Sequence, residues 1–253
     1  MTDACYLAEL GGAQPGDLVV VSGAEGRHAA VVKRTRVGEK VLVSDGRGAA
    51  IHGEVVEVGK QQISVRVTRC LSEPVTAHRW TVVQALAKGD RQEVAVESLT
   101  ELGVARIVAW QAARSIVRWD GRAGAGGKAD KGVERWQATA RESTKQSRRF
   151  RVPKVEYATS EQLRTLISSA DLALVCHEDA ATPLAQVSLP ERGEVVVVIG
   201  PEGGLTVDEL SAFQAVGGQL VSLGDGVLRT SSAGVVALAQ LQVLADLRVQ
   251  DCR

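Results

Sequence analysis

The sequence predicts an α/β protein with two domains, a small β-barrel over residues 1–72 and a larger domain over residues 77–253 built on a parallel sheet. Two observations lead to this prediction. Short β-rich segments bounded by turn residues fill the first 72 residues. From residue 79 onward, strand-like and helix-like segments alternate, which is typical of a parallel sheet covered on both faces. Between the two regions, "SEPVT" at 72–76 has the composition of a linker, stiffened by Pro74.

The N-terminal strands are expected in "DLVVVSG", "EKVLVSDG", "GAAIHGEVVEV" and "QISVRVTRC". In the last of these, Ile63, Val65 and Val67 alternate with polar residues, which is the pattern of a half-buried strand. Asp45-Gly46 predicts a hairpin turn between two of the strands.

In the larger domain, "RWTVVQALAKG" begins as a strand and "DRQEVAVESLTELGV" follows as a helix. Val94, Leu99 and Leu102 are expected on the apolar side of this helix, and Gly103 at its end. Further strands are expected in "ARIVAWQA", "ADLALVCHED", "EVVVVIG" and "QLVSLG". A basic helix is expected in "VERWQATARESTKQSRRF", and a last helix from Ser231 to about Arg248. The glycine-rich segment 120–132 is expected to be mobile.

Composition indicates a soluble, cytoplasmic protein. Hydrophobic residues make up 45% and charged residues 24% of the chain. We expect neither a membrane span nor a signal peptide, because no run of about 18 apolar residues occurs and the N-terminus lacks a basic region followed by an apolar one. The four cysteines lack the spacing of a zinc site, so we expect reduced thiols and no metal, although a site assembled from distant residues remains an alternative.

Charge is unevenly distributed although 30 basic residues balance 30 acidic ones. Residues 114–154 carry twelve Lys/Arg against four Asp/Glu, whereas residues 155–253 carry five against thirteen. A basic segment of this kind can bind a polyanion, and a solvated helix face is the alternative.

Two glycine-rich turns follow expected strands. "EVVVVIGPEGGLTVDEL" places Gly203 and Gly204 after a buried strand, and Thr206 with Glu209 forms a capping box that starts a helix. "LVSLGDGVLRTSSA" repeats the order of strand, glycine turn and helix, and "VCHED" ends a third strand. Because ligand sites of parallel sheets lie at the carboxyl ends of strands, these three ends predict one pocket, with a plain tight turn as the alternative for each. Neither a P-loop nor a GxGxxG fingerprint is present.

These motifs resemble the SPOUT class of S-adenosylmethionine-dependent RNA methyltransferases, and more specifically the ribosomal RNA small subunit methyltransferase E family. The likeness also covers "RHAAVVKRTRVGEKVLVSDGRG", "QALAKGDRQEVAVESLTELGV", "RWQATARESTKQSRR" and "VCHED", in order along the chain. It implies a PUA-like RNA-binding barrel, a trefoil knot over about 195–248 and a homodimer paired through the knot helices. It also implies methylation of N3 of a uridine in 16S rRNA, with the assembled small ribosomal subunit as the substrate. Two departures stand out: Ser231-Ser232-Ala233 replaces the usual Glu-Thr-Ala after Thr230, and "KQSRRF" leaves either Arg148 or Arg149 as the family's arginine.

The resemblance also implies a cofactor site for S-adenosylmethionine. Its expected residues are Leu174, His177, Ile199, Gly200, Pro201, Glu202, Gly203, Gly204, Leu223, Gly224, Val227, Leu228, Thr230 and Ser232. At the reacting centre, Arg229 is expected to stabilise negative charge on the uracil, with phosphate binding or helix capping as the alternative. Glu202 is expected either to accept the N3 proton or to hold its loop by accepting backbone N–H bonds.

Two basic surfaces are expected to contact RNA phosphates. The first comprises Arg27, His28, Lys33, Arg34 and Arg36. The second comprises Arg141, Lys145, Arg148 and Arg149, of which the first three fall on one helical face. Two alternatives to the expected function stay open: a SPOUT enzyme acting on another nucleotide, and a non-catalytic RNA-binding assembly factor that retains the fold.

Overall fold

The computed structural model describes residues 3–119 and 127–251, and the chain divides into two compact units. Unit 1 comprises residues 1–75 and 141–152, and unit 2 comprises residues 76–140 and 153–253. Residues 141–152, which the sequence had assigned to the second domain, therefore pack with the first.

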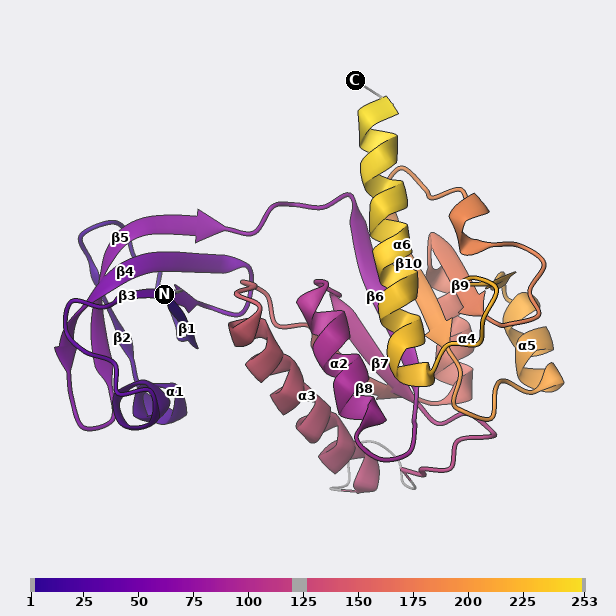
Figure 1. Ribbon diagram of the computed structural model, residues 1–253, viewed down its shortest axis with the longest axis horizontal. Coiled ribbons are helices and arrows are strands. Elements are labelled where there is room, and N and C mark those ends of the chain that lie inside the picture. Colours follow the sequence, from indigo (N-terminus) through magenta and orange to yellow (C-terminus); the bar gives the residue numbers. More distant parts are fainter. Residues whose placement is uncertain (1–2, 120–126, 252–253) are drawn as a thin grey trace. The chain divides into compact units, whose positions relative to one another are not determined.

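Unit 1 is a curled five-stranded sheet in the order β1-β3-β4-β5-β2 (Figure 1). Its strands are β1 (Ala4–Leu7), β2 (Leu18–Val21), β3 (Lys40–Ser44), β4 (Ala49–Val58) and β5 (Ile63–Ser72). β1 pairs in parallel with β3, and the other pairs are antiparallel. Two register shifts between β4 and β5 mark bulges, which bend the strands and help the sheet to curl around its apolar side chains.

The sequence predicted four of these strands and missed β1. It also missed α1 (Gly23–Arg27) and the following π-helical turn (His28–Val32). The predicted hairpin is present: the Asp45 carboxylate accepts hydrogen bonds from the backbone N–H groups of Arg47 and Ala49, at 2.7 and 3.0 Å. These bonds hold the chain in the turn that joins β3 to β4.

Unit 2 contains a six-stranded sheet in the order β11-β9-β10-β6-β7-β8, in which all the pairs are parallel. The strands are β6 (His78–Ala85), β7 (Arg106–Trp110), β8 (Lys154–Ala158), β9 (Leu172–Cys176), β10 (Gly193–Ile199) and β11 (Gln219–Val221). One apolar core covers each face of the sheet. The runs of valine in β10 are buried on both faces, as expected for a central parallel strand.

Helices cover both faces of this sheet. The helices are α2 (Arg91–Glu101), α3 (Lys128–Gln146), α4 (Ser160–Ser169), α5 (Val207–Gln214) and α6 (Thr230–Asp251). α6, yellow in Figure 1, packs against β6, β10 and α2, while α4 and α5 contribute to the core on the other face. All four tryptophans lie in unit 2 and are at most 6% exposed, so they serve core packing.

Unit 2 differs from the sequence-based expectations in one helix face, in one glycine-rich segment and in two elements. Val94 does not lie on the apolar side of α2: it is 45% exposed, because Ala95, Val96 and Leu99 form the buried face. Residues 128–132 of the segment expected to be mobile belong to α3, and residues 120–126 lie outside the described residues. The sequence also missed β8 and α4.

By length and composition alone, one described helix could cross a membrane, over Thr230–Leu247 of α6. Its Ala237, Leu238 and Leu241 are completely buried in the core of unit 2, which is the behaviour of a core helix in a globular domain.

Candidate active site

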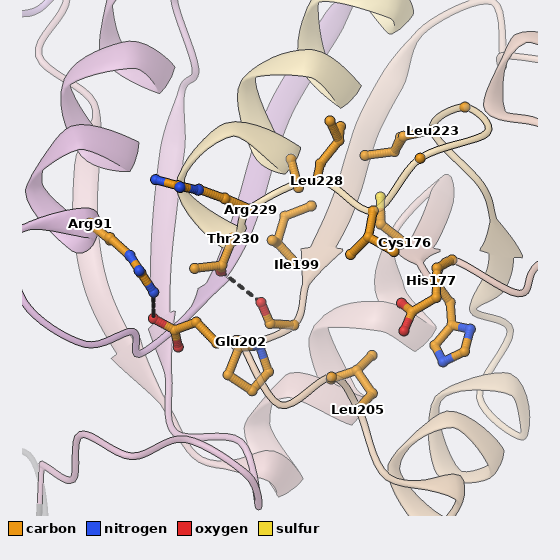
Figure 2. A pocket seen from close by; sticks show the side chains of 18 residues that line it. Arg91, Cys176, His177, Ile199, Glu202, Leu205, Leu223, Leu228, Arg229 and Thr230 are labelled. Atoms are coloured by element: carbon orange, nitrogen blue, oxygen red, sulfur yellow. Dashed lines mark hydrogen bonds and ion pairs between the residues drawn. The ribbon is translucent and has the colours of Figure 1, made fainter.

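A cavity of about 280 Å³ lies at the carboxyl ends of β9 and β10, beside the turn that follows β11 and the first residues of α6. Figure 2 shows its walls. The lining residues are Arg91, Cys176, His177, Glu178, Ile199, Gly200, Pro201, Glu202, Gly204, Leu205, Leu223, Gly224, Gly226, Val227, Leu228, Arg229, Thr230 and Ala233. The three strand ends that the sequence singled out therefore do meet at one cavity.

The first wall is the turn between β10 and α5. Gly204 donates its backbone N–H to the Pro201 carbonyl at 2.9 Å and adopts a φ of 70°, a conformation that favours glycine. The predicted capping box is present: Thr206 Oγ1 accepts from the Glu209 N–H at 3.2 Å, and Glu209 Oε2 accepts from the Thr206 N–H at 2.8 Å. The turn is thus fixed at both of its ends.

Glu202 is tied into this wall by an ion pair. Its Oε1 accepts a hydrogen bond from the backbone N–H of Lys88 at 3.0 Å and another from Arg91 Nη1 at 2.9 Å. Burial acts to raise the pKa of Glu202, but hydrogen bonds from backbone N–H groups and the Arg91 guanidinium outweigh it, so the pKa lies below its ordinary value. A carboxylate stabilised in its charged form is a weak proton acceptor, so this geometry favours the loop-holding role.

The second wall is the turn between β11 and α6. Gly224 has a φ of 148°, and within the described residues the backbone N–H groups of Gly224, Val227 and Leu228 donate no hydrogen bond. Val227 is 80% exposed and Leu228 is 39% exposed, so the turn presents apolar side chains and free donors together. Such a surface suits a planar, partly polar ligand.

Arg229 closes this turn and is exposed. No hydrogen bond or ion pair of its guanidinium is present in the part of the chain that the structure describes. Figure 2 places it on the same side of the cavity as Arg91, and away from His177. Because Arg91 is neutralised by Glu202, Arg229 is the lining cation that is available to a ligand.

Thr230 connects the two turns. Its hydroxyl donates to the Gly200 carbonyl at 2.7 Å and accepts from Gln84 Nε2 at 2.9 Å, and the residue is 5% exposed. The first turn, the end of β6 and the start of α6 are therefore held at one buried point. Since the hydroxyl both donates and accepts a hydrogen bond within the protein, we infer that Thr230 holds the cavity walls in place and does not itself bond a ligand.

The third wall follows β9 and contains Cys176, His177 and Glu178. His177 Nδ1 accepts a hydrogen bond from the backbone N–H of Asp179 at 3.2 Å, which orients the ring in this wall. Burial raises the pKa of the Cys176 thiol to about 12, so this thiol is uncharged and serves as an apolar contact.

Three residues expected at the cofactor site do not line the cavity. Leu174 is fully buried in the core on the α6 side of the sheet. Gly203 lies against Arg114, whose Nη1 donates to the Gly203 carbonyl at 3.0 Å. Ser232 uses its hydroxyl to bond the Arg229 carbonyl at 3.1 Å, within the first turn of α6.

The other expected cofactor residues, and Arg229, line the cavity. Sequence reasoning missed Arg91, Leu205, Gly226 and Ala233, and it named the wall after β9 without Cys176. Only the β-strand period could have indicated Cys176, because it lies two residues beyond Leu174 on the same side of β9.

All nine residues expected to contact RNA belong to unit 1. Arg27, Lys33, Arg34 and Arg36 are exposed, and His28 is half-buried. Arg141 and Arg148 are also exposed, and Arg149 is half-buried.

Lys145 differs from the other expected RNA contacts because it is only 7% exposed. Its Nζ forms ion pairs with Glu25 at 2.9 Å and with Glu142 at 2.7 Å. Burial acts to lower its pKa, but the hydrogen bonds to these two carboxylates outweigh it and raise the pKa. Lys145 is placed to anchor residues 141–152 within unit 1. Elsewhere among the described residues, no group of three or more His, Cys, Asp or Glu side chains is placed to hold a metal.

Comparison with known proteins identifies the family. The family model of an RNA methyltransferase domain matches residues 74–242, and that of an RNA methyltransferase PUA domain matches residues 21–68. The ribosomal RNA small subunit methyltransferase E of Mycobacterium bovis is 40% identical over 94% of this chain and 92% of its own length. The protein of the same name from Bacillus subtilis is 30% identical over 90% of each chain.

Solved structures agree with the sequence comparison. A ribosomal RNA small subunit methyltransferase E from Neisseria gonorrhoeae, bound to S-adenosyl methionine, is similar with a TM-score of 0.83 and 26% identity over 96% of this chain and 98% of its own. A methyltransferase from Legionella pneumophila in complex with the bound cofactor SAM gives a TM-score of 0.79 and 28% identity over 96% and 97%. The predicted fold class, a PUA-like barrel followed by a parallel α/β domain, is confirmed. The chain belongs to the ribosomal RNA small subunit methyltransferase E family.

Proposed function

We propose that this protein transfers a methyl group from S-adenosylmethionine to N3 of a uridine in the 16S rRNA of the small ribosomal subunit. The observation that carries the proposal is the cavity between the two glycine turns, with one available cation at its edge. Membership of the family supports the methyltransferase and rRNA parts. The position on the uracil and the residues involved are our proposals.

The residues of the cavity fit the cofactor. The free N–H groups of Gly224, Val227 and Leu228 are donors for the acceptor nitrogens of an adenine, and Ile199, Leu205 and the leucines of the second turn offer apolar surface to its faces. S-adenosylmethionine, when bound, supplies a methyl group already activated by its positively charged sulfur. The remaining task of the protein is to hold the acceptor in line and to favour loss of the N3 proton.

Arg229 is the residue that we assign to the acceptor. A uracil that loses its N3 proton carries negative charge on its two carbonyl oxygens, and a guanidinium beside one of them stabilises that charge. Glu202 is assigned to holding the first turn through Arg91 and the N–H of Lys88. His177 lies on the other side of the cavity from Arg229, so we assign it to the cofactor wall (Figure 2).

We further propose that the C-terminal segment forms a trefoil knot and that the protein is a cytoplasmic homodimer. α6 packs against β6 and β10, and also against the turn Leu184–Gln186 in the connection from β9 to β10, whose Leu184 N–H bonds the Ser222 carbonyl at 2.8 Å. The connection from β9 to β10 thus lies against both α6 and the chain that leads into it, which supports a knot. Val243 and Leu247 of α6 are 57% and 51% exposed, which suits pairing with a second copy. Light scattering of the purified protein measures this state directly.

The function is tested with methyl-labelled S-adenosylmethionine and small ribosomal subunits from a bacterial strain that lacks its own family member. The rRNA is digested and the labelled nucleoside is identified. We expect label in 3-methyluridine. Label in another nucleoside would move the target, and label in none, with intact unmodified subunits, would favour an RNA-binding assembly factor.

The assignment of Arg229 is tested in the same assay with Arg229→Met. Loss of one preorganised charge partner typically lowers kcat by about 10²-fold or more, so we expect a fall of that order with cofactor affinity within a few-fold of the wild type. Wild-type kcat in this variant would remove Arg229 from the reacting centre.

A further inference from the structure

The basic surfaces found from sequence and the cavity lie in different units. The nine expected RNA contacts all belong to unit 1, whereas every residue that lines the cavity belongs to unit 2. A methyl acceptor base must be held within bonding distance of the donor, and the phosphates beside it are then necessarily close to the cavity. The exposed cations of unit 2 beside the cavity are therefore the candidates for holding the RNA backbone at this point.

The surroundings of the cavity are electrostatically polarised along the sheet. Beyond β9 and β11, the segments 177–180 and 222–229 contain the acids Glu178, Asp179 and Asp225, and Arg229, at the end of the second segment, is their one cation. On the opposite side, the described residues that follow β6 and β7 contribute the cations Lys88, Arg91, Arg114 and Arg118, of which Arg91 is paired with Glu202. The segment between β6 and α2 also contains one exposed acid, Asp90.

Lys88 lies beside the first glycine turn. Its backbone N–H donates to Glu202 Oε1 at 3.0 Å, which fixes its position relative to the turn. Its side chain is exposed, and in residues 3–119 and 127–251 it has no ion-pair or hydrogen-bond partner. A fixed backbone with a free ammonium group suits capture of a phosphate.

Arg114 lies on the other side of the same turn. Its Nη1 donates to the carbonyls of Gly203 and Leu205, at 3.0 and 3.4 Å. These neutral partners hold the guanidinium in place without cancelling its charge, and the side chain is exposed. The planar group therefore has further N–H donors available for a phosphate.

We propose that Lys88 and Arg114 form a phosphate-binding site on unit 2 that holds the RNA backbone next to the target nucleotide, which enters the cavity from the β6–β7 side. The inference rests on the proposed function and names how RNA reaches the site. A base must leave its stack to be modified, and the backbone around an unstacked nucleotide needs cations close to the pocket. Entry from the opposite side would bring phosphates against Glu178, Asp179 and Asp225.

The test compares Lys88→Met with Arg79→Met. Both residues are exposed cations of unit 2. Arg79 is the second residue of β6, at its amino end, whereas Lys88 follows the carboxyl end of β6, beside the cavity. Methionine preserves side-chain length and removes the charge. The affinity of each variant for unmethylated small ribosomal subunits is measured at several salt concentrations, in a binding assay that does not depend on methyl transfer. Arg114→Gln is added because its amide can still donate to the Gly203 carbonyl.

We expect Lys88→Met to weaken subunit binding about tenfold and to lower the slope of log affinity against log salt by about one, which is the effect of one lost phosphate contact. Arg114→Gln should act in the same direction, and both variants should bind S-adenosylmethionine like the wild type. Arg79→Met should match the wild type in every readout. Wild-type affinity and slope in Lys88→Met and Arg114→Gln, or an equal loss in Arg79→Met, would overturn the proposal. Because binding is measured separately, a wild type that binds subunits without methylating them refutes the proposed function and still tests this site.

Discussion

The hydroxyl of Thr230 offers a direct test of how the two turns are held together. Replacing it with valine preserves the shape of the side chain and removes both hydrogen bonds, to the Gly200 carbonyl and from Gln84. Gln84 Nε2 retains a longer bond to the Ala85 carbonyl at 3.3 Å, so the main cost is the buried Gly200 carbonyl that loses its partner. A buried polar group left unpaired costs about 1–3 kcal/mol, and we expect Thr230→Val to destabilise unit 2 by about 2 kcal/mol.

For a domain of this size, such a loss lowers Tm by about 4–8 °C. Tryptophan fluorescence is the appropriate assay, because all four tryptophans are buried in unit 2 and unit 1 contributes none. Ser232→Ala is the matched control, since its hydroxyl is only half-buried and bonds within its own helix. A Thr230→Val protein that melts with the Ser232→Ala protein would refute the reasoning that this hydroxyl joins the turns.

Three further predictions follow from the charged and titratable groups. Because the pKa of Glu202 is lowered on folding, its contribution to stability is present above the ordinary value of 4.5 and is lost as pH falls through the folded pKa, so the wild type and Glu202→Gln should differ in unfolding midpoint at pH 7 and converge in strong acid. Cys176, with a pKa raised to about 12, should resist a thiol reagent at pH 8 under conditions in which the exposed Cys70 reacts, as peptide mapping by mass spectrometry would measure. Lys145→Met should destabilise unit 1 by about 3 kcal/mol, because the Glu25 carboxylate loses its cation. Arg141→Met should instead weaken RNA binding with little loss of stability, because Arg141 is exposed. If both variants weakened RNA binding equally, Lys145 would be an RNA contact after all.

Sequence patterns predicted the elements whose signals are local. The strand before the first glycine turn contains a long apolar run, and Thr206 with Glu209 marks the start of α5 unambiguously. α4 carries the same signal in Thr159 and Gln162, and the capping box there is formed, so this helix was available to sequence reasoning and was overlooked. β8 is different: polar and apolar residues alternate over only four positions, Lys154 to Tyr157, which is short for a strand signal, and pairing with β7 completes it.

The orientation of side chains was less predictable than the elements that carry them. Val94 and Val96 both lie in an apolar stretch of α2, and the sequence does not tell which of them meets the sheet. Leu174 was expected at the cavity because it is close to the strand end, yet a position two residues short of that end is still under α6. A strand end becomes a ligand wall only at the last residue that no helix covers.

The role of a charged residue depended most on tertiary contacts. Lys145 and Arg148 were assigned alike from their spacing, but a carboxylate from α1 meets only the former. The sequence left Glu202 as either a proton acceptor or the residue that holds its loop, and the ion pair with Arg91, from a helix more than a hundred residues earlier, favours the second role. Among the described residues, Arg229 is left at the cavity as a cation without a partner, directly before Thr230, whose hydroxyl bonds both the first turn and the end of β6. The hydrogen bonds of Thr230 therefore fix the backbone beside Arg229 as well as the walls of the cavity, which is where the proposed function needs a cation.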